Sequence, residues 1–166
     1  MKDLKIQYWL CYQLHLLLLW GCIGLGCTPT TKAKMQQEKI ALQQYLKQFN
    51  PDFKGLIACK ITHILIFPAN SCESCSRALL GLLKEMTKKS TFQGIMVTES
   101  KKSYHILLEE QGIPADKILL DDKLVANRAG ILNGIPKLYI FNNCELVKVT
   151  ELTGNINSAE TEANLP

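Results

Sequence analysis

The feature that most constrains the fold of this chain is a pair of cysteines, Cys72 and Cys75, set between a strand-like run and a helix-like run. Residues 64–67 are all apolar, which is typical of a strand buried on both faces of a sheet. After the pair, apolar side chains recur at helical spacing, at Ala78, Leu79, Leu82, Leu83 and Met86. The thiolate is the reactive form of cysteine, and a helix N-terminus stabilises negative charge. The sequence therefore predicts a reactive dithiol at a strand-to-helix junction, with Cys72 nearest the helix N-terminus.

Composition limits the other classes of function. The chain has 166 residues and a formal net charge of +4, and its 19 basic residues are scattered rather than gathered into a stripe. We therefore expect no nucleic-acid binding. A chain of this length fits one domain with ancillary segments.

The cysteines do not form a metal-binding or disulfide-rich pattern. There are seven, at positions 11, 22, 27, 59, 72, 75 and 144. The four outside the N-terminal segment are too few for a disulfide scaffold, and no second C-x-x-C completes a zinc site, so we expect no metal and no other cofactor. We expect Cys59 to be a buried, inert thiol in an apolar strand and Cys144 to be a plain turn residue, with a redox role for either as the alternative.

Residues 1–27 resemble a signal peptide. Their uninterrupted apolar part, residues 16–26, is much shorter than the roughly 20 residues of a membrane span. Small residues precede Cys22 and Cys27, in a pattern similar to the lipobox of bacterial lipoproteins, whose cysteine carries the lipid. We expect lipid on Cys27, with Cys22 as the alternative, because a polar tether follows Cys27. An uncleaved anchor and an ordinary secretory signal are the other interpretations.

The rest of the chain alternates between helical and strand patterns. We expect a tether and short amphipathic helix over residues 28–50, one domain over residues 51–153 and a polar tail over residues 154–166. Within the domain, strands are expected at residues 55–59, 63–67, 92–98, 117–120, 137–141 and 145–152. Helices are expected after the dithiol, after an N-cap at Ser100 and over residues 123–129, and a tight turn at Asn142 and Asn143. This order predicts an α/β fold, with a mixed sheet flanked by helices and ending in a β-hairpin.

A second segment gives the dithiol a family resemblance. Residues 133–147 contain Gly134-Ile135-Pro136 followed by the expected hairpin. Together with the C-x-x-C this resembles the thioredoxin superfamily, over about residues 53–152, and is similar to its membrane-tethered periplasmic branch. The resemblance implies a three-layer α/β/α fold with Cys72 as nucleophile and Cys75 as resolving thiol. It also implies that Pro136 is a cis proline and that, with Ile135, it forms a platform for an extended substrate.

Two positions depart from the family pattern. Ser71 stands where the family usually has tryptophan, and Ile66 stands where many thioredoxins have a buried acid. Glu73, between the two cysteines, disfavours a thiolate beside it and therefore favours the disulfide form. We accordingly expect a reducing rather than a strongly oxidising protein.

These features predict a thiol:disulfide oxidoreductase of the bacterial cell envelope, lipid-anchored and facing the periplasm. Its expected partners are disulfide-bearing envelope proteins, an upstream thiol electron donor and the membrane. Two alternatives are a copper-carrying module that uses Cys72, Cys75 and either His63 or His105, and an inactive scaffold in an envelope complex.

Overall fold

The computed structural model describes residues 31–53, 59–69 and 73–153, and for residues 73–78 it describes the backbone alone. The signal-peptide and lipidation predictions, with Cys22 and Cys27, and the predicted tail lie outside the described residues. All but the first two residues described belong to the unit Ala33–Pro166.

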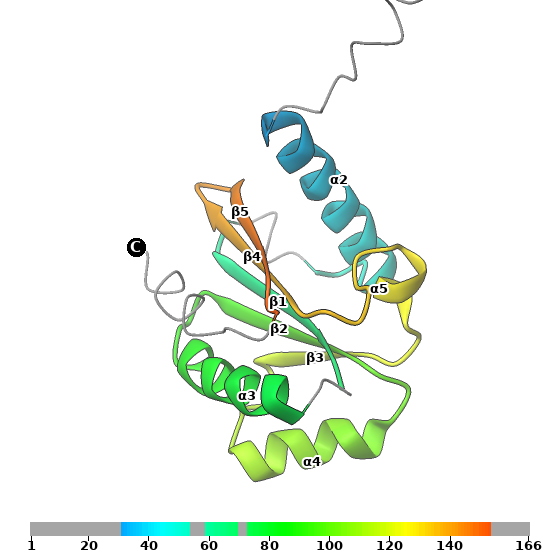
Figure 1. Cartoon of the computed structure of the whole chain (residues 1–166), viewed down its shortest axis with the longest axis vertical. Coiled ribbons are helices and arrows are strands. Elements are labelled where there is room, and N and C mark those ends of the chain that lie inside the picture. Colours follow the sequence, from blue (N-terminus) through cyan, green and yellow to red (C-terminus); the bar gives the residue numbers. More distant parts are fainter. Residues whose placement is uncertain (1–30, 54–58, 70–72, 154–166) are drawn as a thin grey trace, which may run out of the picture. The chain divides into compact units, whose positions relative to one another are not determined.

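Helices and strands alternate along the described chain (Figure 1). The helices are α2 (Thr31–Phe49), α3 (Glu73–Thr87), α4 (Lys101–Gln111) and the short α5 (Val125–Arg128). The strands are β1 (His63–Pro68), β2 (Phe92–Val97), β3 (Ile118–Asp121), β4 (Lys137–Asn142) and β5 (Glu145–Glu151).

The strands form one mixed sheet in the order β3-β2-β1-β4-β5. β1 pairs in parallel with β2, and β2 with β3, while β4 runs antiparallel to both β1 and β5. The helices that connect the parallel strands are the usual crossover connections of such sheets. This is the expected α/β architecture with a C-terminal hairpin, and it is compatible with a thioredoxin-like fold.

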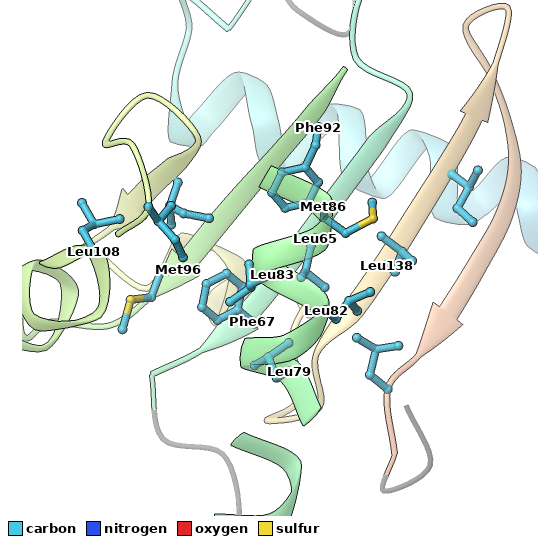
Figure 2. Close-up of a cluster of buried hydrophobic side chains, with 14 residues drawn as sticks. Leu65, Phe67, Leu79, Leu82, Leu83, Met86, Phe92, Met96, Leu108 and Leu138 are labelled. Atoms are coloured by element: carbon cyan, nitrogen blue, oxygen red, sulfur yellow. The ribbon is translucent and has the colours of Figure 1, made fainter. Parts of the chain in front are cut away.

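One face of the sheet packs against α3 and α4. Leu79, Leu82, Leu83 and Met86 of α3 are at most 4% exposed, and Figure 2 shows them directed at Leu65, Phe67 and Leu138 of the sheet. Their spacing of three and four residues puts them on one stripe of the helix. The predicted inward face of the helix after the dithiol is therefore confirmed for these four residues.

The opposite face packs against α2 and α5. Leu42, Tyr45 and Leu46 of α2 join Ile64 and Ile66 of β1 in a second buried cluster, to which β2, β4, β5 and α5 also contribute. Because successive side chains of a strand point to opposite faces, β1 supplies alternate residues to the two clusters. Helices thus cover both faces of the sheet, in three layers.

The ends of α4 follow from local chemistry that the sequence contains. Ser100 Oγ accepts a hydrogen bond from the Ser103 N–H at 3.1 Å, and Gly112 ends the helix with φ 61°. A hydroxyl at the N-cap satisfies a free backbone N–H, and glycine takes the left-handed conformation without steric cost.

Three local predictions differ from the structure. The helix α2 begins at Thr31, within the segment expected to be a tether, because the Lys and Ala residues there are good helix formers. Cys59, at the end of the predicted strand 55–59, lies in an exposed turn, and residues 54–58 are outside the described residues. The hairpin turns one residue later than predicted, since β4 continues through Asn142 and the left-handed residues are Asn143 and Cys144.

Candidate functional site

In the sequence, the predicted dithiol follows β1 and falls at the start of α3. The strand ends at Pro68, Ala69 follows, and α3 begins at Glu73. Cys72 therefore directly precedes the first helical residue, and it lies outside the described residues. Cys75 is the third residue of α3, and its side chain is likewise not described. What the structure supplies is the strand-to-helix junction that the sequence predicted for this pair.

Pro136 reaches the same end of the sheet from a distant part of the sequence. β1 and β4 pair with Ile66 opposite Lys137, so Pro136 comes opposite Phe67, just before β1 enters the dithiol connection. Pro136 is buried, and its carbonyl oxygen accepts a hydrogen bond from the Leu152 N–H at 2.8 Å. This hydrogen bond from the residue after β5 holds Pro136 beside the end of β1.

The peptide bond of Pro136 corrects one implication of the family resemblance. The resemblance implied a cis bond between Ile135 and Pro136, but no peptide bond among the described residues is cis. A trans bond is the intrinsically favoured isomer, by about 0.5–1 kcal/mol before proline.

The backbone of Ile135 remains available for an interaction. Within the described part of the chain, no hydrogen bond engages its N–H or its carbonyl group, and its side chain is half-buried. An unpaired N–H and C=O next to a sheet are the groups with which an extended peptide adds as a further strand. These are the groups that the predicted role of Ile135 in substrate binding would use.

Two concavities flank the start of the dithiol connection, and both include Pro68 and Ala69. One, of about 250 Å³, lies between α3 and α4 and is mainly apolar, with Leu80 and Ile106 in its walls. The other, of about 330 Å³, lies at the carboxyl ends of β1 and β2 and includes Glu99. Ligands of open α/β sheets bind outside the carboxyl ends of the parallel strands, which is where the second concavity lies.

Residue 66 of β1, the position at which many thioredoxins have a buried acid, is an isoleucine. Ile66 is fully buried, in the cluster that includes Tyr45 and Tyr139. The cross-strand partner of Ile66 is Lys137, whose ammonium group pairs with Glu151 at 3.4 Å. Burial, followed by the charges of Glu38 and Glu151, raises the pKa of Tyr139. Position 66 therefore carries an apolar side chain, which can neither take up nor release a proton.

Among the residues whose side chains are described, the one buried carboxylate is Asp121, and it stabilises the core at a different strand. Asp121, at the end of β3, accepts hydrogen bonds from the N–H groups of Val125 at 3.0 Å and Ala126 at 2.8 Å, and from the Tyr45 hydroxyl at 3.4 Å. Burial, followed by the charge of Asp121, raises the pKa of Tyr45. This cluster joins β3, α5 and α2 in the core.

The two candidate histidines lie in different environments. His63 begins β1, so it is separated from the dithiol end by the length of the strand, roughly 17 Å. It is 5% exposed, and burial, followed by the charge of Lys89, lowers its pKa. His63 therefore lies at the end of β1 that is remote from the connection to α3. His105 is exposed on α4 beside Tyr104, and among the described residues no group of three His, Cys, Asp or Glu side chains could hold a metal ion.

A disulfide joins Cys59 and Cys144, with their Cα atoms 5.0 Å apart and 85 positions apart in the sequence. The sequence analysis missed it, because it placed Cys59 in a buried strand, whereas both cysteines are exposed and have left-handed backbone angles. A count of the cysteines could have suggested the pair, because only Cys59 and Cys144 remain once the C-x-x-C and the N-terminal cysteines are set aside. In an oxidising compartment two such residues are a candidate pair.

Comparison with known proteins adds no family assignment. No protein-family model matches the chain, and a search of curated proteins finds no match. Within the ranges that the structure describes, no helix is both long and apolar enough to cross a membrane.

Proposed function

We propose that this protein is a thiol:disulfide oxidoreductase that uses Cys72 and Cys75 to reduce disulfides of bacterial envelope proteins. The observation that carries the proposal is the meeting of two distant segments at one end of the sheet. Pro136 comes opposite Phe67, at the end of β1, because β1 and β4 pair in antiparallel register, and Cys72 follows in the chain between β1 and α3. Reactive thiols are found at helix N-termini, and extended substrates bind at unpaired backbone.

The reaction uses only the thiols and the substrate disulfide. The Cys72 thiolate attacks one sulfur of the substrate disulfide, that bond breaks, and the other substrate sulfur leaves as a thiolate that takes up a proton. Cys75 then loses its proton and attacks the Cys72 sulfur, which releases the second substrate thiolate. The protein ends with a Cys72–Cys75 disulfide, and two electrons have passed to the substrate. A donor dithiol of another protein must return them for a second turnover.

The substrate would bind as an extended strand. In the proposed complex the N–H and carbonyl of Ile135 pair with the substrate backbone, and Pro136 packs against the residue at its cysteine. Glu73 follows Cys72 directly in the sequence, so its charge disfavours the thiolate and favours the reducing direction. The buried Ile66 supplies no proton, so proton exchange with Cys75 would rely on solvent.

The proposed location is the cell envelope, with a lipid on Cys27, or on Cys22, anchoring the domain to the membrane on the periplasmic side. The Cys59–Cys144 disulfide supports an oxidising compartment, because cytosolic proteins are kept reduced. Mass spectrometry of the mature N-terminus tests the anchor. A diacylglyceryl cysteine at position 27 or 22 agrees with it, and an unmodified N-terminus contradicts it.

Insulin reduction with a dithiol donor tests the activity. We expect the wild-type protein to turn over and Cys72→Ser to be inactive. The variant Cys75→Ser should accumulate a mixed disulfide between Cys72 and the substrate. The matched control is the double variant Cys59→Ser and Cys144→Ser, which removes the other cysteine pair and should keep the turnover rate at saturating insulin. Equal rates in wild type and Cys72→Ser would refute the proposal.

A further inference from the structure

The pocket of about 330 Å³ at the carboxyl ends of β1 and β2 has one charged member. Pro68, Val97 and Leu124 form its apolar walls, and Thr98, Glu99 and Ser100 its polar rim. It shares Pro68 with the end of β1, and Cys72 follows Pro68 by four positions in the sequence. Four residues span at most about 14 Å, so a substrate residue next to a cysteine that reacts with Cys72 can come within reach of this pocket.

The turn that carries Glu99 is held on both sides. The Thr98 N–H donates to the Asp121 carbonyl at 3.2 Å, and the Ser100 N–H donates to Thr98 Oγ1 at 3.0 Å. Ser100 in turn caps α4 by accepting from the Ser103 N–H. Because the residues before and after it are fixed in this way, the backbone of Glu99 has a defined position at the pocket. A group held in place loses little conformational entropy when it binds a ligand.

The carboxylate of Glu99 is uncompensated. Glu99 is exposed, and within the described residues it takes part in no ion pair or hydrogen bond. The nearest lysine in sequence, Lys101, is paired with Asp122 at 3.6 Å. The other charged residues of the adjoining turns, Lys102 and Lys123, are exposed and do not line the pocket. The pocket thus combines apolar walls with a single free negative charge, which matches the stem and the charged end of a lysine or arginine side chain.

We propose that Glu99 determines substrate specificity, by selecting disulfides that have a lysine or arginine next to the reacting cysteine. The proposal rests on the dithiol activity proposed above. The apolar stem of the basic side chain would contact Pro68, Val97 and Leu124, and its charge would pair with the Glu99 carboxylate. Glu99 takes no part in the exchange of electrons, so its effect lies in the binding of the substrate.

Glu99 also lies near the N-terminus of α4, where a negative charge is favourable in any case. A structural role of that kind would change the stability of the protein and not its choice of substrate. The readout must therefore be the ratio of kcat/KM for two substrates that differ only in charge.

The test uses two disulfide peptides that are identical except for Lys or Glu beside one cysteine, with the full chain as catalyst and a dithiol such as dithiothreitol as electron donor. We expect kcat/KM to be higher for the Lys peptide. In Glu99→Gln the preference should fall about two- to fivefold, the range of a partly exposed ion pair, and Glu99→Lys should reverse it. The control Glu109→Gln removes an exposed carboxylate elsewhere on α4 and should keep the preference. In 1 M salt the preference should shrink in wild type, because the Debye length falls to about 3 Å.

The outcomes separate this proposal from the one on which it rests. Turnover of both peptides with the same Lys-to-Glu ratio in wild type and Glu99→Gln overturns the role of Glu99 alone. No turnover of either peptide by wild type, or turnover that persists in Cys72→Ser, overturns both proposals. If the preference for the Lys peptide falls equally in Glu99→Gln and Glu109→Gln, it comes from the overall charge of the protein and not from Glu99. That result also overturns the proposal.

Discussion

The Cys59–Cys144 disulfide allows a quantitative prediction, because it closes a long loop. Its two cysteines are 85 positions apart, so it restricts most of the unfolded domain. In the chain-entropy relation, a loop of that length corresponds to roughly 4.6 kcal/mol of stabilisation at 25 °C. Both cysteines have left-handed backbone angles, φ 54° and 67°, and such angles cost about 1–2 kcal/mol per residue. Relaxation at these two positions after the bond is removed offsets part of the loss.

We therefore expect the double variant Cys59→Ser and Cys144→Ser to unfold with a free energy lower by about 2–4 kcal/mol. Urea denaturation measures this change. Both the variant and its reference should carry Cys72→Ser and Cys75→Ser, so that the proposed dithiol cannot exchange with the pair. The dependence of the free energy on urea should also become steeper, because an unconstrained unfolded chain exposes more surface.

Reduction supplies the control. Dithiothreitol should lower the stability of the reference protein to that of the double variant and should leave the variant unchanged. A loss below about 1 kcal/mol, or a variant that still responds to dithiothreitol, would refute the reasoning from loop closure.

Three further predictions concern buried polar groups. Burial lowers the pKa of His63. As the pH falls below about 6.5, His63 therefore takes up a proton in the unfolded chain before it does so in the folded protein. The free energy of unfolding should then decrease by up to about 1.4 kcal/mol per pH unit. Urea midpoints at pH 7 and pH 5.5 should show a smaller decrease in His63→Leu, and an unchanged decrease in the exposed control His105→Leu. Asp121→Ala leaves two buried N–H groups without their acceptor and should cost about 3 kcal/mol in thermal or urea unfolding. The Tyr139 hydroxyl is buried and has no hydrogen-bond partner within the described residues. The variant Tyr139→Phe should therefore leave the free energy of unfolding unchanged or raise it by about 1 kcal/mol. A decrease in the free energy of unfolding by more than about 1 kcal/mol would contradict this.

Much of the fold could be predicted because its signals are local. The apolar stripe of α3, from Leu79 to Met86, follows from a spacing that any helix imposes. The ends of α4 follow from Ser100 and Gly112, whose chemistry fixes a cap within one turn. The alternation of strand and helix then leaves few ways to build a sheet, and the mixed sheet with a final hairpin is among them.

The features that could not be predicted depend on distant residues. The pairing of Cys59 with Cys144 requires the segment before β1 to meet the end of β4, and spacing alone does not show which cysteines pair. The hairpin turn was displaced by one residue because Asn142, Asn143 and Cys144 offer overlapping turns, and the pairing of β4 with β5 selects among them. The apolar character of residue 66, by contrast, was visible in the sequence, and the structure adds that it is fully buried.

The disulfide and the candidate site lie at opposite ends of the same strand pair. Cys59 precedes β1 and Cys144 follows β4, whereas Phe67 and Pro136 stand at the other end of these antiparallel partners. Roughly 17 Å of strand separates these two ends. The disulfide can still act on the site, because it joins the two strands whose register brings Pro136 opposite Phe67. A slip of one residue would turn every side chain of β4 to the other face, and the covalent bond at Cys144 resists such a slip. Loss of the disulfide should therefore weaken substrate binding at Ile135 before it affects the reactivity of Cys72.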